Sequence, residues 1–199
     1  MDAINLYSLA YPVTSLGPGL RVAFWVAGCG KDCPGCISPE MRPPDSGTRV
    51  PGETLLRRLL ELEPGLSGVT VSGGEPFDQA GPLAGLLHAL RVERPDWTVI
   101  IYTGYCLAEL RRKSPEVADL LDCADVLIDG PYLKDVPPAH PLAGSGNQVV
   151  HYLTERGRGL RREMDSAPCQ QVNLGLGRGD FNMVIGVVDE SCRRAFEDA

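Results

Sequence analysis

The sequence is short of positive charge, has few histidines and contains no long apolar run. Its 26 acidic residues outnumber its 19 lysines and arginines, for a formal net charge of −7, which argues against a protein that binds nucleic acid mainly through charge. No apolar stretch approaches the roughly 18–20 residues needed to span a bilayer. The N-terminus lacks a basic segment followed by an apolar core, so no secretory signal is expected. We therefore expect neither nucleic acid nor a membrane as a partner.

The cysteine content and the length indicate the compartment and the number of domains. The seven cysteines are an odd number and three of them are clustered, so a secreted disulfide framework is not expected. A reducing cytoplasm fits this pattern better. A chain of 199 residues with 43% hydrophobic and 23% charged residues predicts one globular domain covering residues 1–199.

Three thiols fall within eight residues, at Cys29, Cys33 and Cys36. They directly follow the apolar run 20–26, which is rich in β-branched and aromatic residues and so predicts a buried strand. The thiols then lie on the loop that leaves the carboxyl end of a strand, where α/β folds place their sites. Glycine and proline residues in this loop suit a tight curl, so the three sulfurs can converge on one group.

The number of thiols limits what that group can be. Structural zinc sites normally have four ligands, and an electron-transfer 4Fe–4S cluster normally uses four cysteines. Three thiolates on a cluster leave one iron without a protein ligand, available to a substrate or cofactor. A Cys3His zinc site, a redox thiol cluster and a chance grouping remain as alternatives, although the three histidines, His88, His140 and His151, are all remote in sequence.

Strands and helices alternate after residue 20, which predicts an α/β domain. About 250 residues are typical of eight β/α units, so we expect an incomplete, partial TIM-type β/α barrel of five to six mainly parallel strands. Its core is expected within about residues 4–150, and its strands and helices are expected at 4–11, 20–26, 51–62, 68–71, 78–90, 97–102, 108–121 and 124–129, with a break at Ser114-Pro115 and a helix N-cap at Asp78. A long loop follows at 133–147, then an irregular basic segment at 155–180, and a closing strand and helix within 181–199.

Two further predicted strands also end in polar motifs. Ser72-Gly-Gly-Glu-Pro76 follows one of them, where Gly73 and Gly74 permit close approach to the backbone and Glu75 offers an acceptor for an ammonium group. Asp129 ends another strand, where its carboxylate can face a ribose hydroxyl or a cation. The alternatives are an ordinary turn at Gly73–Pro76 and a carboxylate at Asp129 that satisfies local backbone amides.

Several of these motifs resemble those of the radical S-adenosylmethionine (SAM) superfamily. The CxxxCxxC spacing, the Gly73-Gly-Glu75 motif and the Gly17-Pro-Gly-Leu-Arg21 lead-in resemble its glycyl-radical-enzyme activating branch. The strand ends Tyr102-Thr-Gly-Tyr105 and Asp129-Gly-Pro, with Gly144-Ser-Gly-Asn-Gln148, are most similar to activators of anaerobic ribonucleoside-triphosphate reductase, which carry arginine where this chain has Ala143. The resemblance covers roughly residues 4–150.

This resemblance implies a 4Fe–4S cluster on Cys29, Cys33 and Cys36, with SAM bound to the open iron. It also implies SAM contacts from a set of residues on the same rim: Gly35, Ile37, Gly73, Gly74, Glu75, Thr103 and Asp129. The implied reaction is reductive cleavage of SAM to a 5′-deoxyadenosyl radical, which removes a hydrogen atom from a glycine of a partner glycyl radical enzyme. An external electron donor such as flavodoxin or ferredoxin is implied too, and no catalytic side chain beyond the cluster and SAM ligands is expected.

Two other functions remain open on the sequence. One is a radical SAM enzyme that modifies a small molecule or peptide directly, which Ala143 and the arginines of 156–178 keep under consideration. Those arginines form either a solvated face or a lid or docking surface for an acidic partner. The other is a non-catalytic iron–sulfur or zinc protein. The remaining cysteines, Cys106, Cys123, Cys169 and Cys192, show no clustered spacing, so no second cluster is expected.

Overall fold

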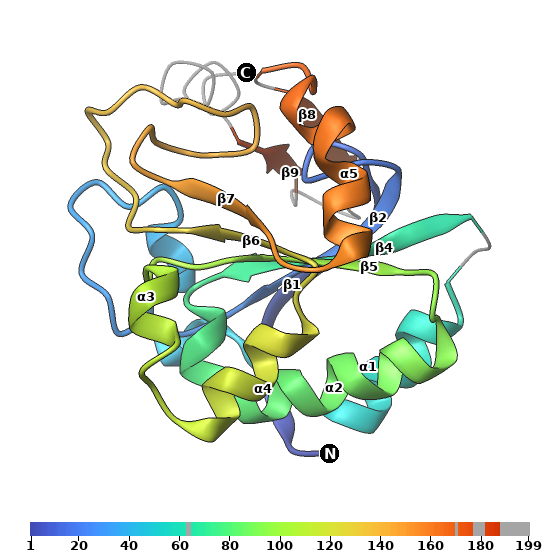
Figure 1. Cartoon of the computed structure of the whole chain (residues 1–199). Helices are drawn as coiled ribbons and strands as arrows, with labels where there is room; N and C mark the ends of the chain where they lie inside the picture. Colours follow the sequence, from blue (N-terminus) through green and yellow to red (C-terminus); the bar gives the residue numbers. More distant parts are fainter. Residues whose placement is uncertain (63–64, 170, 177–181, 188–199) are drawn as a thin grey trace.

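A computed structural model describes residues 1–62, 65–169, 171–176 and 182–187. A seven-stranded sheet crosses the molecule in the order β3-β1-β2-β4-β5-β6-β7 (Figure 1). Its strands are β1 (Ala3–Val13), β2 (Leu20–Val26), β3 (Thr48–Pro51), β4 (Leu66–Gly73), β5 (Thr98–Tyr102), β6 (Val126–Asp129) and β7 (Val149–Tyr152). The four central strands, β2, β4, β5 and β6, are parallel, whereas β1, β3 and β7 pair antiparallel at the two sides.

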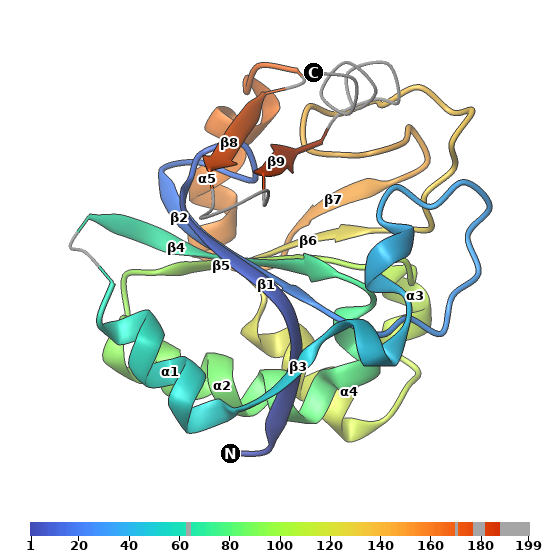
Figure 2. The ribbon, with the colours of Figure 1, turned by 180° about the vertical axis from the view of Figure 1, so that it is seen from behind.

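Helices cover one face of this sheet, and a different set of elements covers the other. Figures 1 and 2 show α1 (Gly52–Leu60), α2 (Ala80–Glu93) and α4 (Pro115–Cys123) together on one face, with α5 (Glu155–Asp165) and the hairpin β8 (Val172–Leu176)–β9 (Asn182–Gly186) on the opposite face. The short helix α3 (Leu107–Leu110) lies on the same side of the molecule as the loop that follows β2. Three 3-10 helices, η1 (Pro39–Met41), η2 (Pro44–Ser46) and η3 (Pro76–Gln79), complete the description.

Alternation along the central strands builds the core on both faces. Val22, Phe24 and Val26 of β2 point to the helical layer, while Ala23 and Trp25 point to the other face. The helical layer supplies the leucines predicted from their spacing in the sequence, and each is 2% exposed or less: Leu83, Leu86, Leu87 and Leu90. Because both faces are covered, most residues of the central strands are buried.

Arg21, the last residue of the Gly-Pro-Gly lead-in, is completely buried near the amino ends of the central strands. Its guanidinium donates to the Thr70 hydroxyl at 2.8 Å, to the Thr98 hydroxyl at 3.0 Å and to the carbonyls of Thr98 at 2.8 Å and Val69 at 2.6 Å. Burial lowers the pKa of Arg21 to about 10. The arginine of this motif therefore joins β2, β4 and β5 within the fold, far from the carboxyl ends of the strands.

Most predicted elements are present within one or two residues of their expected bounds. The break at Ser114-Pro115 separates α3 from α4, as expected, and the loop 133–147 contains no helix or strand. Cys123 is buried, whereas Cys106 and Cys169 are exposed. Cys192 and the predicted helix 190–199 lie outside the described residues.

The structure also corrects several predictions. The described residues of segment 155–180 are not irregular, because they include α5 and β8. Only Gly157 and Met164 of α5 are buried, so the apolar period of this helix is too weak to recognise in the sequence. The predicted closing strand pairs with β8 rather than with the main sheet. Asp78 is not a helix N-cap, since it lies inside η3 and Gln79 precedes α2. The strands β3 and β7 were not predicted, although Val149–Tyr152 consists largely of strand-forming residues.

The domain is therefore α/β, with a mixed sheet of seven strands instead of five or six mainly parallel ones. Three of its six strand pairings are parallel. The edge strands β3 and β7 do not pair with each other, so the sheet is open, and the comparison with a partial TIM-type barrel stays a prediction. Among the described residues, no helix has the length and apolar character needed to cross a membrane.

Candidate functional site

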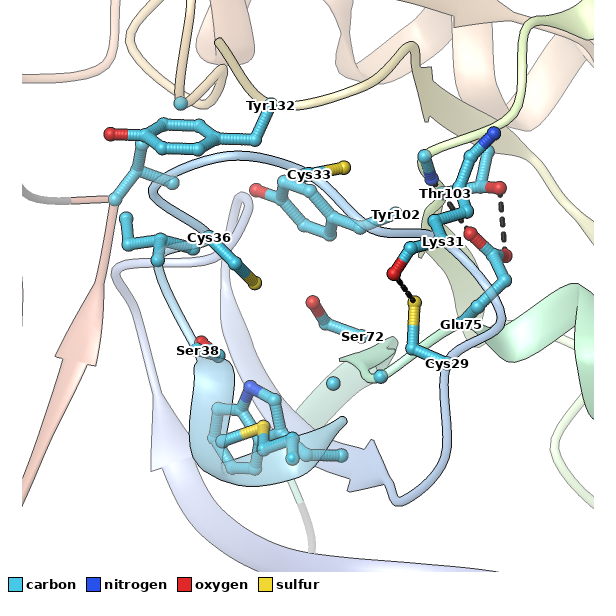
Figure 3. A pocket seen from close by; sticks show the side chains of 18 of the residues that line it. Cys29, Lys31, Cys33, Cys36, Ser38, Ser72, Glu75, Tyr102, Thr103 and Tyr132 are labelled. Carbon is cyan, nitrogen blue, oxygen red and sulfur yellow. Dashed lines mark hydrogen bonds between the residues drawn. The ribbon is translucent and has the colours of Figure 1, made fainter. Parts of the chain in front are cut away.

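A cavity of about 490 Å³ lies where β2, β4 and β5 end. Figure 3 shows the loop that carries the three cysteines curving around it, with Cys29 and Cys36 on opposite sides of Ser72 in this view. Eight of the ten residues predicted for the site line this cavity: Cys29, Cys33, Cys36, Ile37, Gly73, Gly74, Glu75 and Thr103. The fold thus brings together motifs that are separated by up to 74 residues in the sequence.

Backbone hydrogen bonds shape the cysteine loop. The amides of Gly28 and Cys29 donate to the carbonyls of Met41 and Arg42, at 2.9 and 3.1 Å, which closes the loop at its base. Within the loop, the amide of Cys36 donates to the carbonyl of Cys33 at 3.2 Å. Burial raises the pKa of the Cys29 thiol, so metal binding is what would deprotonate it at neutral pH. Main-chain bonds therefore hold the loop, and the Cys29 thiol also donates to the carbonyl of Lys31 at 3.8 Å (Figure 3).

Asp78 connects the cysteine loop to the end of β5. One carboxylate oxygen accepts from the amide of Gly30 at 2.8 Å, and the other accepts from the hydroxyl of Tyr105 at 3.0 Å. The ammonium groups of Lys31 and Lys113 lie 3.9 and 3.8 Å from the centre of the Tyr105 ring. These contacts, which the sequence pattern did not predict, hold the second residue of the CxxxCxxC segment against η3 and β5.

Glu75 is 1% exposed, and its carboxylate is surrounded by donors. Oε1 accepts from the amide of Phe77 at 3.0 Å and from the hydroxyl of Thr103 at 2.8 Å, while Oε2 accepts from the amide of Gly104 at 2.8 Å. Burial raises the pKa of Glu75 to about 7, although these donors oppose the rise. In this arrangement Glu75 fastens the end of β4 to the end of β5 and still lines the cavity.

Gly73 and Gly74 are required by the chain's own backbone. Gly73 has a φ of 113°, and a Cβ there would lie 2.4 Å from both N and O of Val26. A Cβ on Gly74 would lie 2.1 Å from the carbonyl oxygen of Gly28, because the amide of Glu75 donates to that oxygen at 2.9 Å. The two glycines were expected to permit close approach of a ligand, but here they permit close approach of the chain's own backbone at the end of β2. This contact holds the Gly-Gly-Glu turn next to Cys29.

Two predicted residues lie away from the cavity lining. Asp129 is 5% exposed, its Oδ2 accepts from the amide of Leu107 at 2.5 Å, and Nε2 of His151 lies 3.1 Å from its Oδ1. Gly35 has a φ of 69°, and a Cβ there would lie 2.8 Å from the side chain of Lys134. Asp129 thus has a main-chain partner in α3, and its contact with SAM stays a prediction.

Residues in and beside the loop 133–147 contribute to another part of the cavity lining. Gln148 accepts from the amide of Gly144 at 2.7 Å and donates to the carbonyl of Gly130 at 3.0 Å, and all three residues line the cavity. Ala143, the position at which the resembling activators carry arginine, is completely buried.

Sequence reasoning missed most of the remaining lining. Trp25 and Tyr102 line the cavity from the strand positions that face away from the helical layer, so the alternation in β2 and β5 is the signal that could have identified them. Four more residues come from β9 and its end, Val184, Ile185, Gly186 and Val187. Nothing in their local sequence indicates that they reach this cavity.

The residues present fit a cluster held by three thiolates. No histidine lines the cavity, which counts against the Cys3His alternative, and of the described cysteines only Cys29, Cys33 and Cys36 do so. Within the part of the chain that the structure describes, no three His, Cys, Asp or Glu side chains are grouped to hold a single metal ion. Thiolates on an iron–sulfur cluster each bind a different iron, so they need not meet at one point.

Comparison with known proteins agrees with this chemistry. A family described as "4Fe-4S single cluster domain" matches residues 15–151, more than half of the chain and all of the cysteine loop. The chain belongs to the 4Fe-4S single cluster domain family. The family match therefore supports an iron–sulfur cluster at this site and disfavours the zinc alternative.

Several curated relatives share one description, "anaerobic ribonucleoside-triphosphate reductase-activating protein". The chain is 33% identical to the one from Escherichia coli K12 over 154 residues, which are 74% of this chain and 98% of the relative. It is 33% identical to the one from Vibrio cholerae over 155 residues, again 74% and 98%. The relative from Enterobacteria phage T4 is 27% identical over 153 residues, which are 75% of this chain and 95% of the relative.

Proposed function

We propose that this protein is a radical SAM enzyme that activates an anaerobic ribonucleoside-triphosphate reductase by generating a glycyl radical on it. The observation that carries the proposal is the placement of three thiols from one eight-residue loop on the cavity that the Gly-Gly-Glu turn also lines. The names of the relatives support the choice of partner. We place the reaction in the reducing cytoplasm, where the scattered cysteines stay free.

A 4Fe–4S cluster bound at this site would supply one electron, received from an external donor of the flavodoxin or ferredoxin class, for the reductive cleavage of SAM that the proposed removal of a glycine hydrogen requires. Cys29, Cys33 and Cys36 would hold the cluster. Gly73, Gly74 and Glu75 keep the end of β4 against the cysteine loop, and Thr103 locks Glu75 in place. Trp25, Met41 and Ile185 give part of the cavity an apolar lining, which would limit the water beside a bound substrate.

The proposal also assigns Glu75 to the ammonium group of SAM. Its two oxygens already accept three hydrogen bonds, and a carboxylate offers about four lone-pair sites. One acceptor site therefore stays available on a side chain that lines the cavity. An ammonium ion there would offset the cost of burying the carboxylate charge.

The first test uses anaerobic reconstitution of the full chain with iron and sulfide, followed by reduction and addition of SAM. We expect a bound 4Fe–4S cluster and release of 5′-deoxyadenosine with an equal amount of methionine. A protein that binds the cluster but releases no 5′-deoxyadenosine contradicts the radical SAM chemistry.

The second test separates reductase activation from direct action on a small molecule or peptide. The reduced protein and SAM are incubated with the anaerobic ribonucleoside-triphosphate reductase of the same organism, and the mixture is examined by EPR. We expect the doublet of a glycyl radical, absent when the reductase glycine is replaced by alanine. Release of 5′-deoxyadenosine without any radical on the reductase would favour a direct substrate instead.

A further inference from the structure

The hairpin β8–β9 belongs to a part of the chain that the relatives lack. The alignment with the Escherichia coli relative already uses 98% of that protein but only 74% of this chain. An alignment that includes the family match at residues 15–151 and covers three quarters of this chain ends before β8 begins at Val172. The relative therefore has no residues left to form this hairpin, whereas in this chain β9 and its end contribute Val184–Val187 to the cavity lining.

The hairpin is fixed to the turn between β1 and β2 by a compact set of polar bonds. Oδ1 of Asn173 accepts from the amides of Thr14 and Ser15, both at 2.9 Å. The hydroxyl of Ser15 donates to the carbonyl of Ile185 at 2.7 Å. These bonds join β8 and β9 separately to one turn, so the hairpin has a defined seat above the cavity.

Apolar packing completes that seat. Ile185 is 4% exposed and lies in one cluster with Leu16, Trp25 and Met41, all of which also line the cavity. A Cβ on Gly186 would lie 2.4 Å from the carbonyl oxygen of Gln171, so the two strands approach closely at this end. The side of β9 that carries Ile185 is thus occupied by the fold itself.

Two apolar side chains on the opposite side of the hairpin, those of Leu174 and Val184, are exposed. Val184 pairs with Leu174 across the two strands, so their side chains are direct neighbours on one face. They are 37% and 60% exposed. Val184 also lines the cavity, so this apolar pair extends from the reaction space to the molecular surface.

We propose that Val184 and Leu174 form a specificity wall that contacts the polypeptide segment of the reductase as it enters the cavity. This proposal rests on the proposed function. A protein substrate must pass the rim of the cavity to bring a backbone glycine to the cysteine loop, and the wall is part of that rim. Because the relatives lack the hairpin, the radical chemistry is carried out by the domain that they share with this chain. The wall affects only which reductase is bound.

The test measures glycyl radical yield against reductase concentration for Val184→Glu and Leu174→Glu. A buried carboxylate at an apolar contact is costly, so we expect the half-saturating reductase concentration to rise at least tenfold in both variants. The maximum rate should stay within about twofold in Leu174→Glu, because Leu174 does not line the cavity. Val92→Glu is the matched control, since Val92 is 78% exposed on α2, on the other face of the sheet, and its substitution should change neither value. Iron per chain and melting temperature confirm that each variant is folded.

The outcomes are distinguishable. Unchanged half-saturation in both hairpin variants, with normal radical yield, overturns the wall and leaves the proposed function standing. If the wild-type protein yields no glycyl radical, the proposed function itself is wrong. If sedimentation shows a wild-type dimer that Val184→Glu dissociates, the apolar pair is an interface between two copies of this chain and the proposal is wrong. Asn173→Ala, which frees the hairpin without adding charge, should raise half-saturation in the same direction.

Discussion

The hydroxyl of Tyr105 donates a 3.0 Å hydrogen bond to Asp78, whose other oxygen accepts from the amide of Gly30 in the cysteine loop. Through this pair, the end of β5 helps to fix a loop that begins at the end of β2. Neither residue lines the cavity. Both are therefore positioning residues for the loop that would hold the cluster.

Removing this pair should loosen the loop. Asp78→Ala deletes two hydrogen bonds and Tyr105→Phe deletes one while keeping the ring beneath Lys31. A hydrogen bond contributes about 0.5–1.5 kcal/mol, so loss of iron to a chelator from the reconstituted protein should be about fivefold faster in Asp78→Ala and less affected in Tyr105→Phe. Equal rates of iron loss in all three proteins would show that the pair does not position the loop.

Each of the three clustered cysteines should be necessary for iron, and the others should not. Cys29→Ala, Cys33→Ala and Cys36→Ala are expected to lose most of the iron and sulfide taken up during anaerobic reconstitution. Cys106→Ala is the matched control, because Cys106 is exposed and does not line the cavity. Iron and sulfide analysis with the visible absorption spectrum decides the outcome; full iron uptake by any of the first three variants would contradict the ligand assignment.

Glu75 should make stability depend on pH in a specific direction. Its folded pKa is raised to about 7 from an ordinary value of 4.5, so the folded state binds the proton more tightly than the unfolded state. Its contribution is then most favourable below pH 4.5 and is lost as the pH rises through 7. We expect the free energy of unfolding of wild type, relative to Glu75→Gln, to fall between these limits by up to about 3 kcal/mol.

Urea unfolding of the metal-free protein at several pH values measures this difference. Subtracting the Glu75→Gln curve removes the effect of other groups, such as Asp125, whose pKa is lowered. If the difference stays constant between pH 4.5 and 7, or grows with pH, burial does not raise the pKa of Glu75.

Gly74 and Gly159 should respond oppositely to alanine. A Cβ on Gly74 would lie 2.1 Å from the Gly28 carbonyl oxygen, whereas nothing lies within 4 Å of the same atom on Gly159 in α5. Gly74→Ala must separate β4 from the cysteine loop, so we expect several kcal/mol of destabilisation and impaired iron uptake. Gly159→Ala should raise the free energy of unfolding by about 0.5–1 kcal/mol, the usual gain for alanine in a helix. Urea unfolding curves compare the two.

Arg21 should be essential for stability. Arg21→Met leaves its buried acceptors, the carbonyls of Val69 and Thr98 among them, without a donor, and each unsatisfied buried group costs about 1–3 kcal/mol. We therefore expect a loss of about 3 kcal/mol or more. Arg49→Met, at an exposed position on β3, should change stability by about 0.5 kcal/mol or less. A tolerated Arg21→Met would mean that the removed charge was as costly as the hydrogen bonds are favourable.

The alternating strands and helices of the first 130 residues follow from local pattern. Apolar runs such as Leu20–Val26 and the leucines of α2 predict burial directly, because removing apolar side chains from water stabilises the folded chain. The helix α5 did not follow from pattern, since Gly157 packs where a Cβ would lie 2.0 Å from the carbonyl oxygen of Asp125 and most of its other residues face water. Its N-cap, Thr154, was the available signal.

An iron–sulfur site can be predicted from residue type and spacing, because three thiols lie in a tight loop after one buried strand and a Gly-Gly-Glu turn follows another, and the family match supports this prediction. The binding and cleavage of SAM stay predictions. The surroundings of these motifs cannot be identified in that way. Asp78, Tyr105 and the β8–β9 hairpin reach the site through contacts between distant segments, and Arg21 and Asp129 are satisfied within the fold. Ligand type is a local property of side chains, whereas neighbourhood depends on how strands and loops far apart in sequence are brought together.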